Sequence, residues 1–255
     1  MTSSYLRLDA AEIVKTLQAL EKRIAERFPN SGLAGVCSEL IDVGRSTQRK
    51  AEAIAVPNLW LRALVGFVIV AGIAGVAIIA LAIVQSIEVR MNTEVFGFFE
   101  GVDAAMNIAV LVSAAIFFAI SLDDRMKRRR ALTDLHVFRS IAHVIDMHQL
   151  TKDPSIVMGQ AHPTAASPKR TMNRFELTRY LDYCSEMLAL TGKLAALYAQ
   201  SLPDTVVINA VNEIESLTAG LSRKIWQKIT ILEMLEDKAE RSGASAPGQR
   251  AMLPS

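Results

Sequence analysis

Residues 64–84 read LVGFVIVAGIAGVAIIALAIV, a run without a charge or a strongly hydrogen-bonding side chain. A hydrocarbon core of ~30 Å is crossed by about 20 helical residues, each adding 1.5 Å. A soluble helix of this length normally keeps a polar face, and this one has none. Trp60 suits the membrane interface, and the long side chain of Arg62 can reach the headgroups. The run therefore predicts a transmembrane helix.

A second apolar block follows at residues 104–120 and reads AAMNIAVLVSAAIFFAI. It is less uniformly apolar than the first block, since the polar residues Asn107 and Ser113 lie inside it. The link between the blocks is short, which favours an antiparallel pair of helices. We expect an all-α integral membrane protein with a two-helix transmembrane hairpin over residues 58–122.

The distribution of basic residues predicts the orientation of this hairpin, because Lys and Arg are retained on the cytoplasmic side. The link between the blocks holds one basic residue, Arg90, among several acids. Basic residues gather on the outer flanks of both blocks, at Arg45, Arg49, Lys50, Arg62, Arg125, Lys127, Arg128, Arg129 and Arg130. We expect two passes with both termini in the cytoplasm, in the inner membrane if the cell is bacterial.

The rest of the chain has helical periodicity and no strand pattern. The expected segments are a helical hairpin at 1–57, a juxtamembrane helix at 123–150, a linker at 151–170, an antiparallel helical hairpin at 171–240 and a disordered tail at 241–255. We expect the N- and C-terminal segments to form one cytoplasmic bundle. The apolar stripes that define these helices include Ile13, Leu17, Leu20, Ile24, Phe28, Leu135, Phe138, Ala142, Ile145, Leu177, Leu181, Cys184, Leu188, Ala195, Tyr198, Val207, Val211, Ile214, Leu221, Ile225, Leu232 and Leu235.

Composition argues against several classes of protein. Hydrophobic residues make up 51% of the chain and mean hydropathy is +0.27, an excess that is concentrated in the two apolar blocks. A net charge of +2 gives no field that favours nucleic acid. The only cysteines, Cys37 and Cys184, have no CxxC partner, so we expect packed thiols without a disulfide framework or zinc ribbon. The sequence contains no phosphate loop, GxSxG or HExxH motif, so we expect neither an enzyme nor a cofactor.

Three histidines in residues 136–148 suggest a metal or pH-sensing site. His136, His143 and Asp146 share one stripe of a predicted helix, and imidazole with carboxylate binds divalent transition metals. Seven residues separate the two histidines, about 10.5 Å along the helix axis, so one ion would need ligands from another helix. The alternative is a polar helix face that packs against the bundle.

Other polar and small residues suggest contacts of the membrane segment. Glu100, Asp103 and Asn107 share one face and could ring a cation pore, or the two acids could simply favour a helix N-terminus. The basic run Arg125, Lys127, Arg128, Arg129 and Arg130 predicts contact with anionic lipid headgroups, a fixed inside orientation, or both. Ala71, Gly72 and Gly75 permit close helix packing, within the hairpin or between protomers, but such residues are also common in membrane helices.

These features favour a membrane-anchored helical protein that self-associates or binds a cytoplasmic protein partner through its bundle. Its other expected partner is the lipid bilayer, and we expect no binding to nucleic acid. One alternative is an oligomeric ion channel or pore-forming effector, and another is a membrane-tethered metal or pH sensor. In outline, with helices on both sides of a membrane hairpin, the chain resembles the SLATT-type two-membrane-helix proteins. That resemblance implies a pore-forming effector in bacterial conflict.

Overall fold

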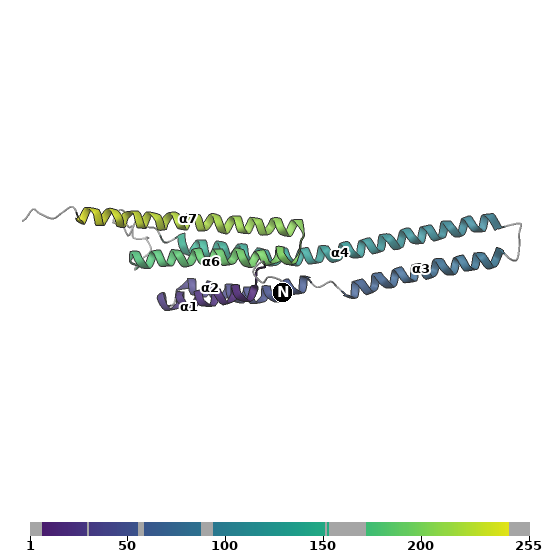
Figure 1. Cartoon of the computed structure of the whole chain (residues 1–255), viewed down its shortest axis with the longest axis horizontal. Coiled ribbons are helices and arrows are strands. Elements are labelled where there is room, and N and C mark those ends of the chain that lie inside the picture. Colours follow the sequence, from purple (N-terminus) through teal and green to yellow (C-terminus); the bar gives the residue numbers. More distant parts are fainter. Residues whose placement is uncertain are drawn as a thin grey trace, which may run out of the picture. The chain divides into compact units, whose positions relative to one another are not determined.

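A computed structural model describes residues 7–29, 31–55, 59–87, 94–150, 152 and 172–244 of the chain. Within these ranges every regular element is a helix (Figure 1). The helices are α1 (Ala10–Arg27), α2 (Gly32–Ala55), α3 (Leu59–Ile87), α4 (Glu94–Leu150), α6 (Arg174–Ser201) and α7 (Thr205–Ala244). The prediction of an all-helical chain is confirmed for these residues.

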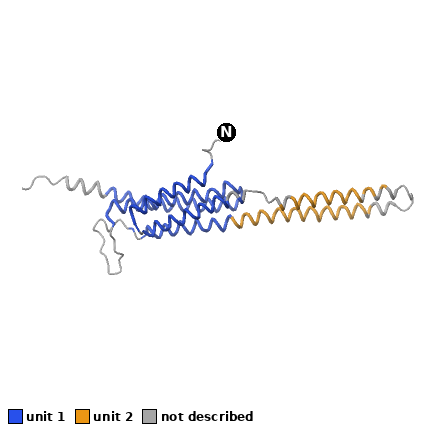
Figure 2. Tube along the Cα trace, turned by 90° about the horizontal axis from the view of Figure 1, so that it is seen from below, with its two compact units in different colours: residues 1–53, 131–255 blue, residues 54–130 orange. Residues whose placement is uncertain are grey.

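The chain divides into two compact units (Figure 2). Unit 1 comprises residues 1–53 and 131–255, and unit 2 comprises residues 54–130. Helix α4 contributes to both, because its 57 residues run without a break from Glu94 to Leu150. The juxtamembrane helix expected at 123–150 is thus a continuation of the second apolar helix.

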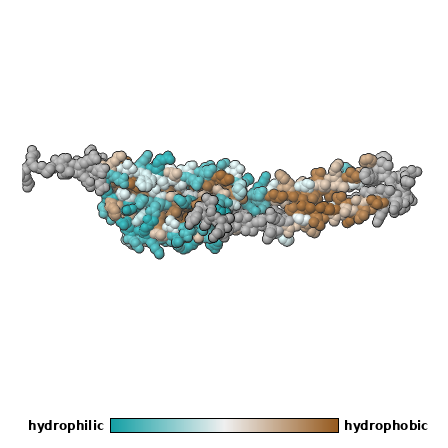
Figure 3. Space-filling model, in the orientation of Figure 1, coloured by the Kyte–Doolittle hydropathy of each residue, from teal (hydrophilic) through white to brown (hydrophobic). Residues whose placement is uncertain are grey.

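Unit 2 contains α3 and the first part of α4, which lie side by side with opposite chain directions (Figures 1 and 2). Residues Gly101–Leu150 form a helix long and apolar enough to cross a membrane, by length and composition. None of its most apolar 18-residue window is buried inside the protein. In α3 the described side chains include a shorter apolar helical stretch, Ala63–Ile78. Figure 3 shows hydrophobic residues gathered over this unit.

Unit 1 has a conventional hydrophobic core. Segments of α1, α2, α4, α6 and α7 contribute fully buried side chains, among them Leu17, Leu40, Phe138, Leu188 and Ile225. The apolar stripes predicted for these helices are buried at every position whose side chain is described. Leu235 is outside the described side chains. The predictions of the buried faces, which were made from a helical period of 3.6 residues, are therefore confirmed at these positions.

Glycines mark two of the closest approaches in unit 1. A Cβ placed on Gly44 of α2 would lie 3.0 Å from Val14 Cγ2 and 3.4 Å from Leu194 Cδ1. A Cβ on Gly32, at the start of α2, would lie 2.6 Å from His148 Cε1. The absence of a side chain at Gly44 thus lets α1, α2 and α6 meet tightly, and at Gly32 it makes room for the His148 ring.

Polar side chains define the starts of the helices in unit 1. Asp9 Oδ1 accepts a hydrogen bond from Ala11 N at 2.8 Å, and Asn173 and Glu176 form a reciprocal capping box at the start of α6. Asp204 Oδ1 accepts from Val206 N and Val207 N at 3.0 and 3.2 Å and so caps the start of α7. Helix α7 continues to Ala244, so the first four residues of the expected tail, 241–244, are helical. Residues 153–171 and 245–255, which include most of the expected linker and tail, are outside the described residues.

Candidate functional site

The polar residues at the start of the apolar part of α4 lie on its surface. Asp103 and Asn107 are both exposed, and Asn107 Nδ2 is 3.5 Å from Asp103 Oδ2. The side chain of Glu100 is outside the described residues. Ser113 satisfies its hydroxyl within the helix by donating to Ala109 O at 2.7 Å. The structure therefore brings together two members of the predicted pore-mouth group, Asp103 and Asn107.

The predicted packing residues of α3 have open space around them. Ala71 is exposed, whereas Gly72 and Gly75 are half-buried. A Cβ added to either glycine would meet nothing within 4 Å outside its own helical turn. Within the described part of one chain, no neighbouring segment uses these glycines for a close approach.

The basic run on α4 has two kinds of position. Arg125, Arg129 and Arg130 are exposed, while Lys127 and Arg128 are half-buried. Lys127 Nζ lies 2.9 Å from Asp123 Oδ2 one turn earlier on the helix. The exposed members can reach anionic lipid headgroups, and Lys127 is held by its acidic neighbour.

The histidine group does not assemble a metal site within the described residues. His136 and His143 are exposed, and Asp146 accepts a hydrogen bond from Gln149 Nε2 at 2.6 Å. No group of three or more His, Cys, Asp or Glu side chains in this part of the chain is arranged to hold an ion. His148, by contrast, packs against Gly32 of α2.

A polar cluster around the partly buried carboxylate of Asp134 joins three helices of unit 1, and sequence reasoning missed it. Asp134 of α4 accepts from Lys50 Nζ of α2 at 2.5 Å and from Tyr198 Oη of α6 at 3.0 Å. Tyr198 is fully buried and its ring meets Phe138 edge-on at 6.3 Å between centroids. Burial raises the pKa of Tyr198 well above its ordinary value, and the Asp134 carboxylate raises it further. The phenol is therefore a fixed donor to Asp134.

A second polar cluster lies at the C-terminal end of α4. Lys228 of α7 donates to the carbonyls of Gln149 and Lys152, at 3.1 and 3.4 Å. It also donates to Gln149 Oε1 at 2.6 Å, so both ends of this almost fully buried amide are bonded. Because the last carbonyls of a helix carry partial negative charge, the ammonium group stabilises this terminus.

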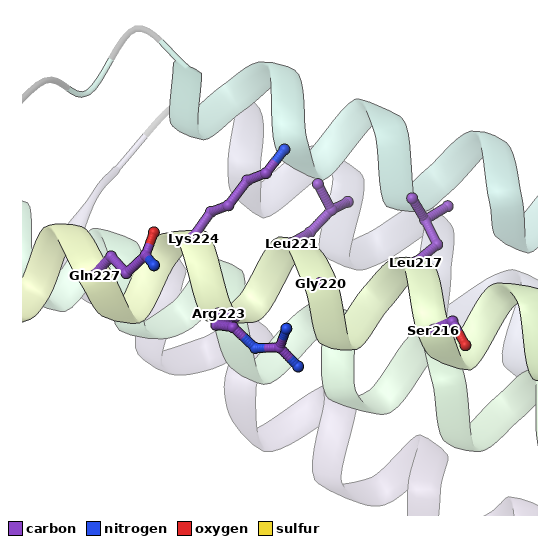
Figure 4. A pocket seen from close by; sticks show the side chains of 7 residues that line it. All are labelled: Ser216, Leu217, Gly220, Leu221, Arg223, Lys224 and Gln227. Carbon is purple, nitrogen blue, oxygen red and sulfur yellow. The ribbon is translucent and has the colours of Figure 1, made fainter.

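The surface of α7 has a shallow depression with a volume of about 480 Å³ (Figure 4). It is lined by Ser216, Leu217, Gly220, Leu221, Arg223, Lys224 and Gln227. Figure 4 shows Leu221 and Lys224 directed toward the neighbouring helix and Arg223 directed away from it. The depression is open and its basic side chains diverge, so it does not form a built ligand site.

Comparisons with protein-family models, with curated proteins and with solved structures gave no match.

Tyr198→Phe should reduce the free energy of unfolding by about 1–3 kcal/mol, because a partly buried hydrogen bond from the phenol to a carboxylate is lost. A double-mutant cycle with Asp134→Asn, followed by denaturant unfolding in mild detergent, should give a coupling energy above 0.5 kcal/mol. Asp42→Asn is the matched control, since Asp42 pairs with Arg45 while its side chain is 74% exposed. That control should change stability by less than about 0.5 kcal/mol. Additive effects of Tyr198→Phe and Asp134→Asn would contradict the assignment.

Both thiols should be unreactive in the folded protein. Burial raises the pKa of Cys37 and of Cys184 from 9.0 to about 12, since a thiolate would lose its hydration there. Unfolding exposes both thiols to water, where their pKa returns to 9.0. Above pH 9 the unfolded chain therefore loses these protons before the folded protein does. The free energy of unfolding should be unaffected by the thiols below pH 9 and should fall as pH rises from about 9 toward 12. Iodoacetamide labelling at pH 8 with and without denaturant, and melting curves at pH 8 to 11, test this.

The Cys37→Ala, Cys184→Ala double variant controls for the other alkaline groups and should show a shallower loss of stability with pH. Equal labelling rates in native and denatured samples would show that the thiols are accessible in the native state.

Proposed function

We propose that this chain is a two-pass membrane protein whose helical unit 1 lies in the cytoplasm, where it associates with further copies or with a partner protein. In this proposal α3 and the first part of α4 are the two transmembrane helices, and unit 1 is the interaction module. The role is structural or signalling rather than enzymatic.

The observation that carries the proposal is the extent of apolar surface on unit 2. Phe117 is 74% exposed, Leu111 70% and Phe67 71%, and the most apolar window of α4 has no buried residue. A soluble protein buries such side chains, each worth ~1.5–3 kcal/mol, against other protein. Here no described protein segment covers them, and a bilayer supplies the apolar surroundings that they need.

Two further features support the proposed topology. Helices α3 and α4 run side by side in opposite directions, as two successive membrane crossings would (Figure 1). An even number of crossings would return the chain to its original side, and the basic residues near Arg49 and Arg129 support a cytoplasmic location for that side.

The proposed interaction role rests on how unit 1 uses its polar groups. The ion pairs Arg23–Glu186, Lys50–Asp134 and Arg139–Glu213 each join two different helices. These groups hold long helices together rather than converge on a substrate. A helical module joined to a membrane anchor through α4 is suited to assembly.

The full-length protein should remain with membranes after a sodium carbonate wash and leave them only with detergent. A reporter inserted after Asn92 should report the exterior, and reporters at either terminus the cytoplasm. Leu111→Arg should lower membrane retention, because a basic residue at mid-span costs ~2.5–3.5 kcal/mol of insertion free energy. Trp226→Arg on α7, at an apolar side chain that is 53% exposed, is the control and should stay in the membrane. Folded wild-type protein in a detergent-free supernatant would refute the proposal.

The exposure of Asp103 and Asn107 favours a second candidate function, an oligomeric cation channel. In a ring of copies these side chains would line the outer mouth, where a carboxylate favours cations. Purified protein in a planar bilayer should then conduct, and Asp103→Asn should lower the cation-to-anion permeability ratio. Ser113→Ala, which alters a hydroxyl bonded within its own helix, is the control. Absence of conductance across pH and voltage would exclude this function.

A further inference from the structure

The outward surface of α4 within unit 1 lacks formally charged side chains. Between Ala131 and Leu150 the helix carries Asp134, Arg139 and Asp146, and none of them is at a fully exposed position. Asp134 bonds Lys50 and Tyr198, Arg139 pairs with Glu213 of α7, and Asp146 bonds Gln149. The exposed positions hold only Thr133, His136, Val137, Ser140, His143, Val144, Met147 and Leu150.

This pattern differs from that of a solvated helix, which turns its charges outward. Helix α7 follows the ordinary pattern, with Glu213, Glu215, Arg223, Lys224 and Glu233 at exposed positions. On α4 the exposed fractions are 41% for Val137, 39% for Val144 and 66% for Met147. Depletion of charge and enrichment of Met are typical of the buried centre of a protein interface.

The exposed apolar residues follow a regular spacing. Thr133, Val137, Ser140, Val144 and Met147 are separated by alternating steps of four and three residues, and all five are exposed. We call these five residues the outer stripe of α4. Alternating steps of three and four average 3.5 residues, the repeat with which two parallel helices keep one seam in contact.

The same alternation, continued toward the amino end of α4, leads to Arg130, Met126 and Asp123. Arg130 and Met126 are exposed, whereas Asp123 is half-buried and lies 2.9 Å from Lys127 Nζ. The uncharged part of the repeat is therefore the outer stripe within unit 1.

We propose that the outer stripe of α4 packs against the same stripe of a second copy of this chain, with the two α4 helices parallel. This inference rests on the proposed membrane topology, because a bilayer forces every copy to insert α4 in the same direction. Two identical stripes then match along their whole length. Since the stripe carries no charge within unit 1, it meets itself without like-charge repulsion.

The polar members of the outer stripe fit this arrangement. Thr133 and Ser140 are small, so they allow close approach of two backbones between the larger Val137, Val144 and Met147 contacts. Isolated polar positions in a coiled-coil seam fix the register of the two helices. A symmetric contact of this kind gives a closed dimer, the commonest form of soluble oligomer.

Disulfide cross-linking in intact membranes tests the proposal. Single cysteines at Val137, Val144 and Met147, in a Cys37→Ala, Cys184→Ala background, should form dimers several-fold faster than Ala219→Cys. Ala219 is an exposed position on α7 and serves as the matched control. Yields scanned along residues 133–147 should peak every three or four residues.

A second experiment does not depend on cross-linking geometry. Wild-type protein in mild detergent should have the mass of a dimer by light scattering. The double variant Val137→Lys, Val144→Lys should be monomeric, with unchanged helix content because both positions are on the surface. Ala219→Lys should remain dimeric.

The outcomes separate this inference from the proposed function. Carbonate-resistant protein that is monomeric in detergent, or cross-links equally at every exposed position, would overturn the α4 dimer and leave the membrane topology intact. Protein that fails to fractionate with membranes would overturn both.

Discussion

Exposed apolar side chains cover α3 and the first part of α4, and contact of this surface with water is unfavourable. The proposed topology depends on this constraint. The described side chains of these helices are largely exposed, and no soluble core hides them. The hydrophobic effect therefore acts between this surface and its surroundings instead of within the chain. In a bilayer, helices are also the structure that satisfies every backbone hydrogen bond within one segment. The helical form of unit 2 and its proposed placement in lipid thus have the same cause.

Helix α4 belongs to both units and, in the proposed topology, connects two different environments. Its apolar part would face lipid, whereas its last twenty residues, Ala131–Leu150, pack in the hydrophobic core of unit 1. The buried stripe Leu135, Phe138, Ala142 and Ile145 and the bond from Tyr198 to Asp134 hold this part of α4 within unit 1.

The polar groups of unit 1 fall into two kinds. Some, such as Asp9, Asn173 and Asp204, begin helices, and these are local bonds visible in the sequence. Others, such as Asp134 and Gln149, connect helices that are distant along the chain. Gln149 is almost fully buried and Asp134 is partly buried, so both need partners, since an unsatisfied buried polar group costs about 1–3 kcal/mol. Their partners lie on other helices and are lost if the helices shift.

The sequence by itself determined the helical class and the buried stripes of α1, α6, α7 and the last part of α4, whereas it did not show that α4 runs unbroken from Glu94 to Leu150. These properties follow from local rules: apolar length, capping side chains and a period of 3.6. Tertiary structure alone decided that Lys50 and Tyr198, 84 and 64 positions from Asp134, meet on one carboxylate. It also decided that Gly44 marks a close crossing and that His148 lies against Gly32 while His136 and His143 face outward. Periodicity states which residues share a face, but the neighbour that each face meets depends on how whole helices pack, and that is a property of the assembled core.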